Sequence, residues 1–135
     1  RSIIMSISSF QSLIVWQKGH QLVLDIYRMT KSFPDDERFS LISQIRRSSL
    51  SITANIAEGY RKIGKKDKLR FFNISQGSLA ETLNYIILSY DLGLISKLDY
   101  LQYENQIEEV NRLLNAYCSK IVNDSTNGEA ISSNF

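Results

Sequence analysis

The sequence is poor in the residues that build disulfide and metal sites, because it has one cysteine and one histidine. Cys118 alone cannot form an internal disulfide, and His20 has no cysteine or carboxylate at a metal-site spacing. No apolar run approaches the roughly 18 residues of a membrane span. The first residues do not read as a secretion signal, so we expect a cytoplasmic protein.

Catalytic signatures are missing as well, since nothing resembles a nucleophile with its base. Residues 59–66, GYRKIGKK, have the spacing of a phosphate-binding loop. However, Lys66 stands where a serine or threonine would hold magnesium, and the preceding residues are helical. Glu104, Glu108 and Glu109 lack the Glu-x-x-His pairs of metal-binding helix bundles. We therefore expect no enzyme activity, no cofactor and no metal.

What the sequence does contain is helical periodicity. Apolar residues recur every three or four positions in four segments, at about 14–33, 35–63, 69–91 and 97–121. Pro34 and Gly64 separate the first three segments, and Ser96 is predicted as the N-cap of the fourth. Four amphipathic helices with short loops predict an all-α fold, an antiparallel up-down-up-down four-helix bundle. We assign residues 1–13 to a flexible N-terminal segment, 14–122 to the bundle and 123–135 to a disordered tail.

Charge is distributed unevenly along the chain, although the net charge is only +2. Residues 38–70 carry nine basic and two acidic side chains, net +7, whereas residues 71–135 carry three and eight, net −5. Such asymmetry indicates either an anionic partner such as nucleic acid or helices that attract one another within an oligomer.

Most of the positive charge gathers where the second predicted helix meets the third. We call these residues the basic junction: Arg61, Lys62, Lys65, Lys66, Lys68 and Arg70. Tyr60, Phe71 and Phe72 flank the junction, but Tyr60 and Phe72 occupy core-periodic positions. We therefore expect binding to phosphates with little base preference. The alternative is a solvated loop whose cations interact with the C-terminal end of the second helix.

The second predicted helix has three distinct faces. Isoleucines 45, 52, 56 and 63 form the core face, and a second arc holds Phe39, Ser43, Leu50, Ala54 and Ala57. Because one apolar face is enough to close a bundle, the second arc is predicted to pack against another subunit. Polar residues on or beside the third face are predicted to form a structural network or an interface: Arg46, Arg47, Ser51, Asn55, Glu58 and Glu81. A solvated face with local ion pairs is the alternative.

Several motifs carry a family resemblance. They are Trp16, "FP" at 33–34, "QIRR" at 44–47, "SI" at 51–52, "NIAEG" at 55–59, "GSLAE" at 77–81 and "LGLIS" at 92–96. In this order they resemble the four-helix-bundle family first met as proteins encoded by intervening sequences in bacterial large-subunit ribosomal RNA genes. That family includes relatives of the accessory variability determinant of diversity-generating retroelements.

The resemblance implies an all-α homo-oligomer, typically a pentameric barrel with a basic surface. In the accessory variability branch it also implies binding to nucleic acid and to a reverse transcriptase. The signature positions are Arg46, Arg47, Ser51, Asn55, Glu58, Gly59, Gly77, Ser78 and Glu81. One departure is "RRSSLSI", with serines where relatives often have alanines, so these serines either loosen the packing or add hydrogen bonds. The acidic fourth helix is a second departure.

The sequence therefore predicts a non-catalytic oligomeric scaffold that binds RNA or DNA through the basic junction, as an accessory factor to a reverse transcriptase. Two alternatives remain. One is a protein-interaction adaptor whose basic junction docks an acidic protein surface. The other is a structural oligomer in which the +7 segment of one subunit meets the −5 segment of the next. The sequence does not decide which signature arginine is buried.

Overall fold

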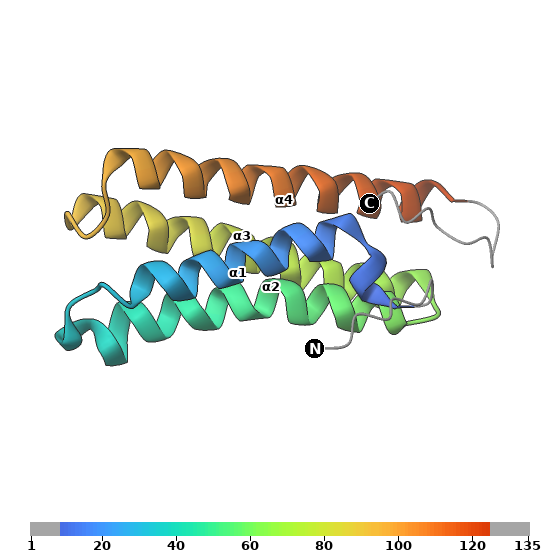
Figure 1. The fold of residues 1–135 in the computed structure, drawn as a ribbon. Coiled ribbons are helices and arrows are strands. Elements are labelled where there is room, and N and C mark those ends of the chain that lie inside the picture. The colour runs from blue at the N-terminus through green and yellow to red at the C-terminus, as the bar shows by residue number, and fades with distance from the viewer. Residues whose placement is uncertain (1–8, 125–135) are drawn as a thin grey trace.

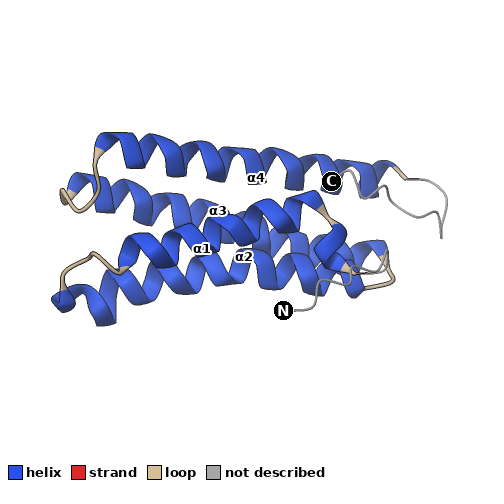
Figure 2. Ribbon diagram, in the orientation of Figure 1, coloured by secondary structure: helices blue, strands red, loops and turns tan. Residues whose placement is uncertain are grey.

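The computed structural model describes residues 9–124, which form four α-helices and no strand (Figures 1 and 2). The helices are α1 Ile14–Thr30, α2 Ser43–Arg61, α3 Lys65–Asp91 and α4 Lys97–Asn123. The α2–α3 turn lies at one end of the molecule, and the α1–α2 and α3–α4 connections lie at the other (Figure 1). The all-α prediction is confirmed.

The predicted flexible and disordered segments fall mostly on residues 1–8 and 125–135, which lie outside the described residues. Within the first segment, Phe10–Ser12 form a short 3-10 helix that begins at Ser9, whose hydroxyl accepts a hydrogen bond from the Gln11 amide. Leu13 is 1% exposed and joins the core. Folded structure therefore begins before residue 14.

The helix ends near α4 follow the sequence signals. Ser96 is the N-cap of α4, and its hydroxyl accepts a hydrogen bond from the Asp99 amide at 3.1 Å. Gly93, just after α3, has a φ of 76°, a left-handed conformation that costs glycine little. The Leu94 amide donates to the Ser89 carbonyl at 2.9 Å, which satisfies a carbonyl at the end of α3.

The connection between α1 and α2 differs from the prediction. Helix α1 ends at Thr30, three residues before the predicted end at Phe33, because the residue before a proline is driven out of the helical region. A 3-10 helix, Asp35–Glu37, and a π-helical turn, Arg38–Ile42, then lead into α2. In this wide turn Leu41 is buried while Phe39 is 88% exposed.

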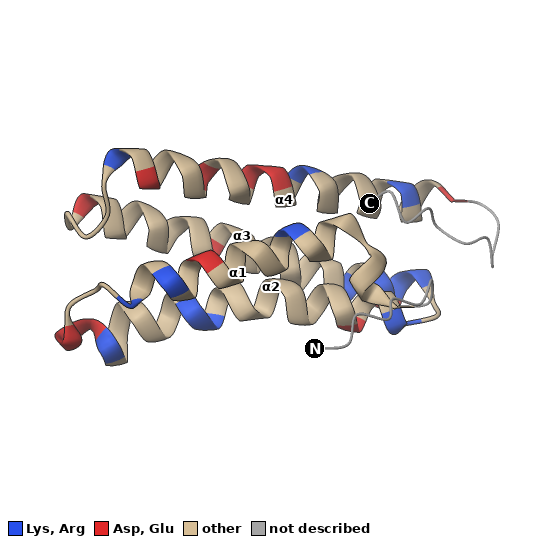
Figure 3. Ribbon diagram, in the orientation of Figure 1, with Lys and Arg blue, Asp and Glu red and all other residues tan. Residues whose placement is uncertain are grey.

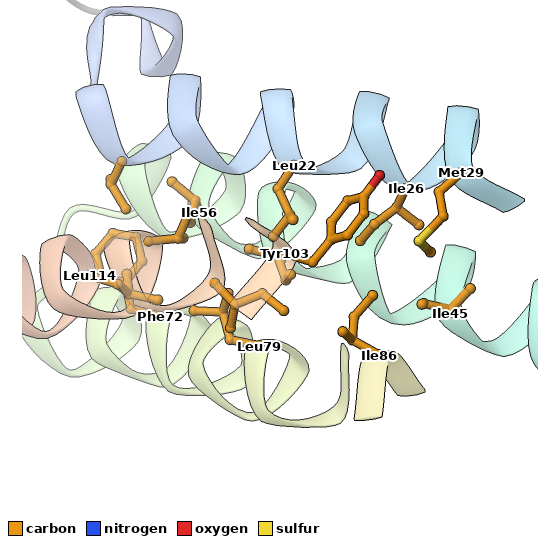
Figure 4. Packing of buried hydrophobic residues seen from close by; sticks show 14 of the residues in the cluster. Leu22, Ile26, Met29, Ile45, Ile56, Phe72, Leu79, Ile86, Tyr103 and Leu114 are labelled. Atoms are coloured by element: carbon orange, nitrogen blue, oxygen red, sulfur yellow. The ribbon is translucent and has the colours of Figure 1, made fainter. Parts of the chain in front are cut away.

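All four helices contribute to one hydrophobic core (Figure 4). Its central side chains include Val15, Leu22 and Ile26 of α1, Ile45, Ile52 and Ile56 of α2, Phe72, Leu79 and Ile86 of α3, and Ile107, Val110, Leu114 and Ile121 of α4. Ile63 is an exception to the predicted core face, being 99% exposed. It follows the C-cap of α2, where Lys62 turns the backbone to an extended conformation and ends the helical periodicity.

No helix within residues 9–124 is long and apolar enough to cross a membrane.

Candidate functional site

The basic junction lies at the α2–α3 end of the molecule, where lysines and arginines gather in Figure 3. The C-terminus of α2 and the N-terminus of α3 are separated only by residues 62–64, so six cations share a small volume. At the opposite end, the α1–α2 connection carries acidic residues Asp35, Asp36 and Glu37 (Figure 3). Basic side chains therefore gather at one end of the fold, and acidic side chains of the α1–α2 connection lie at the other.

Lys68 turns back onto the end of α2. Its Nζ donates to the Tyr60 carbonyl at 2.8 Å and to the Gly59 carbonyl at 3.3 Å. The ammonium also lies 5.6 Å from the centroid of the Tyr60 ring. Burial lowers the pKa of Lys68 below its ordinary value. Lys68 therefore caps carbonyls at the C-terminal end of α2, as the solvated-loop alternative expected of a cation there.

Phe71 holds two further cations of the junction. The Arg70 guanidinium carbon lies 4.6 Å from the centroid of the Phe71 ring, and the Lys62 Nζ lies 5.1 Å from it. Each cation also has an acidic neighbour, Asp67 at 3.9 Å from Arg70 and Glu58 at 3.6 Å from Lys62. Because its ring already contacts two cations, Phe71 is a poor platform for a nucleic-acid base.

The side chains of the remaining cations, Arg61, Lys65 and Lys66, form no hydrogen bond or ion pair with any residue between 9 and 124. Arg61 and Lys66 are exposed and Lys65 is half-buried. These three side chains can reach an anion without first breaking an internal contact. They are the part of the junction best placed to bind phosphate.

Arg46 belongs to the helix packing. Its Nε donates to the Thr30 hydroxyl at 2.8 Å, and its Nη2 donates to the Tyr27 carbonyl at 3.3 Å. The guanidinium carbon lies 4.5 Å from the centroid of the Tyr27 ring. Arg46 thus joins α2 to the last turn of α1, whereas Arg47 is exposed. This answers which of the two signature arginines is the more buried.

Ser51 and Asn55 connect to α3 through one further residue. The Asn55 Nδ2 donates to the Ser51 hydroxyl at 3.0 Å and to the Ser51 carbonyl at 2.8 Å. Ser78 of α3 donates to the Ser51 hydroxyl at 2.7 Å. These three side chains form a small hydrogen-bonded group between the two helices.

The charged members of the predicted network lie outside this group. Arg47, Glu58 and Glu81 are exposed in the single chain. Glu58 pairs with Lys62 on its own helix, and Glu81 accepts a hydrogen bond from the Tyr85 hydroxyl at 3.3 Å. No ion pair joins Arg47 to another of residues 9–124. Within residues 9–124 these charged side chains form no buried network, which leaves both an interface and a solvated face with local ion pairs, such as Glu58 with Lys62, as alternatives.

Two features of the structure were not located by the sequence reasoning. The first is a set of small buried side chains between α2 and α3, in which the Ser48 and Thr82 hydroxyls share a hydrogen bond of 2.8 Å. The Ser75 hydroxyl also donates to the Ile52 carbonyl at 2.8 Å. Of the serines in "RRSSLSI", Ser48 and Ser51 take part in hydrogen bonds to α3, which is one of the two outcomes that the sequence left open. The Ser49 hydroxyl instead donates to the Arg46 carbonyl of its own helix.

The second feature is a groove of about 420 Å³ at the acidic end. It is lined by Glu37, Phe39, Ser40, Leu41, Gln44, Tyr85, Leu88 and Leu92. The groove lies between the π-helical turn and the last turns of α3. Periodicity could not find it, because the wide turn changes the direction of Phe39 and Leu41 relative to a regular helix.

The remaining titratable groups of residues 9–124 include one cysteine and the carboxylates of the four helices. No group of three or more His, Cys, Asp and Glu side chains in residues 9–124 could hold a metal ion. Burial raises the pKa of the Cys118 thiol, which keeps it in its less reactive protonated form.

Comparison with known proteins agrees with the fold. A family model described as "23S rRNA-intervening sequence protein" matches residues 11–116. A crystal structure from Bacteroides thetaiotaomicron, a protein with unknown function from the S23 ribosomal protein family, is 26% identical, with a TM-score of 0.73. The similarity covers 78% of this chain and 96% of that one. No curated protein matches. Because the family match spans most of the sequence, this chain belongs to the 23S rRNA-intervening sequence protein family.

Proposed function

We propose that this chain is a non-catalytic scaffold of the cytoplasm that assembles as a homo-oligomer, a pentamer of antiparallel up-down-up-down bundles, and binds nucleic acid through the basic junction. A reverse transcriptase is the protein partner that the family resemblance suggests. The observation that carries the proposal is the group of three unpaired cations, Arg61, Lys65 and Lys66, beside two cations held on Phe71.

The charges of the basic junction favour a polyanion as the ligand over a small acidic molecule. The junction offers several cations over a short stretch, and Glu58 and Asp67 are the acidic side chains that pair with them within residues 9–124. The side chains that the junction offers are cations, which favours contact with a phosphate backbone over reading of bases. Repeating the junction around an oligomer would add phosphate contacts from each copy.

Exposed apolar residues support assembly. On α2, Leu50 and Ala54 lie on the surface, as does Phe39 in the preceding turn. These residues belong to the second apolar arc of the sequence, which the core of the single chain leaves uncovered. A neighbouring subunit would remove this arc from water.

Fluorescence anisotropy with a structured RNA and a DNA duplex tests the proposal, at about 50 and 200 mM salt, where phosphate contacts weaken strongly. We expect binding that falls steeply with salt, with little difference between sequences. The variant Arg61→Glu, Lys65→Glu, Lys66→Glu should abolish it. Lys68 is left unchanged, because its loss would disturb the end of α2.

A matched control uses the same three charge reversals on the far end of the molecule, Lys31→Glu, Arg38→Glu and Lys97→Glu. If the basic junction is the binding site, this control variant should keep most of the wild-type affinity for nucleic acid. Absence of binding at low salt, or equal loss in both triple variants, would refute the proposal.

The groove favours a second candidate function, a protein-interaction adaptor. Its lining combines Phe39, Leu88 and Leu92 with the carboxylate of Glu37. Such a site suits an apolar side chain flanked by a basic one. An oligomer that binds no nucleic acid, and whose binding to a protein partner is lost on Phe39→Ser, would favour this candidate.

A further inference from the structure

Gly77 stands in the middle of α3, where glycine needs a reason. A glycine inside a helix lowers the folding equilibrium constant about fivefold relative to alanine, because the unfolded chain gains freedom. Gly59 has such a reason, since an added Cβ would lie 2.6 Å from Phe72 Cε1. At Gly77 an added Cβ would meet nothing within 4 Å. Nothing in residues 9–124 therefore requires glycine at this position.

The surface around Gly77 carries apolar side chains that the single chain leaves partly uncovered. Ile74, three residues before, is 44% exposed, and Leu88, eleven residues after, is 42% exposed. These spacings place both on the same helix face as Gly77. The face continues at one end into the apolar groove, which Leu88 also lines.

Unpaired charge borders the same face. Ser78, next to Gly77, is hydrogen-bonded to Ser51, which places α2 beside this part of α3. One turn from this contact lie Arg47 on α2 and Glu81 on α3. Both are exposed, and neither forms an ion pair with another of residues 9–124. A second chain packed on this face would therefore contact one positively charged and one negatively charged side chain.

We infer that a second copy of this chain packs across α3 at Gly77, where the absence of a Cβ lets its backbone come close. A second copy can supply complementary charge, because residues 71–135 have a net charge of −5 and residues 38–70 have a net charge of +7. This inference rests on the proposed assembly and names one face used in it. Ile74 and Leu88 would be covered, and Arg47 and Glu81 would find partners on the neighbour.

Mass measurement by light scattering on four proteins tests the inference: the wild type, Gly77→Ala, Gly77→Leu and the control Ala116→Leu. Ala116 is exposed on α4, so its enlargement leaves α3 untouched. We expect the control to keep the wild-type mass. Both Gly77 variants should dissociate, with at least a tenfold higher midpoint concentration for assembly.

Gly77→Ala guards against a simple failure to fold, because alanine favours the helix more than glycine does. After dilution to the monomer, this variant should melt at a higher temperature than the wild type, although it assembles less well. Equal masses for all four proteins would overturn the chosen face while leaving the oligomer standing. A monomeric wild type would overturn both this face and the proposed assembly, and the anisotropy titration would still decide nucleic-acid binding by itself.

Discussion

The α2–α3 pair and the α1–α4 pair are held together in different ways. Helices α2 and α3 make the most extensive contact of any pair of described helices, through small side chains such as Ser48 and Thr82. Helices α1 and α4 share the hydrophobic core, and the polar contacts that join them come from long side chains. The Tyr103 hydroxyl donates to the Asp25 carbonyl at 2.9 Å, and the Lys18 Nζ lies 3.6 Å from a carboxylate oxygen of Glu109.

The difference shows how side-chain size affects the way in which each pair of helices packs. Small residues let two helix axes approach closely, and their buried hydroxyls bond across the contact. This closely packed pair carries both the basic junction and the Gly77 face. The contact between α1 and α4 includes ionisable side chains, namely those of Lys18, Tyr103 and Glu109. The first pair should therefore be sensitive to volume, and the second should be sensitive to pH.

The largest expected effect comes from adding volume between α2 and α3. Gly59→Val would place a Cβ about where the Phe72 ring lies, and that ring packs against Tyr117 at 5.0 Å between centroids. We expect a loss of about 3 kcal/mol of unfolding free energy, at the upper end for overpacking. Urea denaturation measures it. Ala116→Val, an exposed position on α4, serves as control and should change stability by less than about 0.5 kcal/mol. Equal losses of unfolding free energy in Gly59→Val and Ala116→Val would show that the contact between α2 and α3 is not especially sensitive to added volume.

High pH should weaken the contacts of α4. Burial and the nearby Asp25 carboxylate raise the pKa of Tyr103 to about 12, and burial raises that of Tyr117 to about 12. Because the folded-state pKa lies above the ordinary value, the stabilisation is complete below pH about 10 and is lost as pH rises toward 12. We expect on the order of 2 kcal/mol lost per ring.

Urea melts between pH 8 and 11.5, with tyrosinate absorbance followed in parallel, measure this effect. Tyr103→Phe keeps the ring but cannot ionise, so it should lose stability less steeply above pH 10. An unchanged slope in that variant would contradict the assignment of the pH sensitivity to Tyr103.

The smallest effect concerns the hydroxyl pair between α2 and α3. Ser48→Ala and Thr82→Ala should each cost about 1 kcal/mol, since each removes a buried hydrogen bond while the remaining hydroxyl keeps a local carbonyl acceptor. The double variant should cost about 0.5 kcal/mol less than the two losses added together. Lys18→Met, which removes the exposed pair on the α1–α4 side, should change stability by less than about 0.5 kcal/mol. Strict additivity at Ser48 and Thr82 would show that the two hydroxyls act independently.

The sequence alone determined the helices, most of the core and the end of the molecule that carries positive charge. Periodicity at three and four residues is a local property, so it predicted the buried positions Ile45, Ile52 and Ile56 directly. It also predicted the cap at Ser96, because capping depends on neighbours in the chain. The family motifs were equally readable, and the family match followed from them.

Only the tertiary structure decided what each polar residue does. Arg46 and Arg47 are adjacent in sequence, yet one binds Thr30 of α1 and the other is exposed. Lys68 and Lys66 both looked available for phosphate, but Lys68 caps α2. Such roles depend on which helix lies opposite a side chain, and helical periodicity gives the face of a residue but not the partner across it.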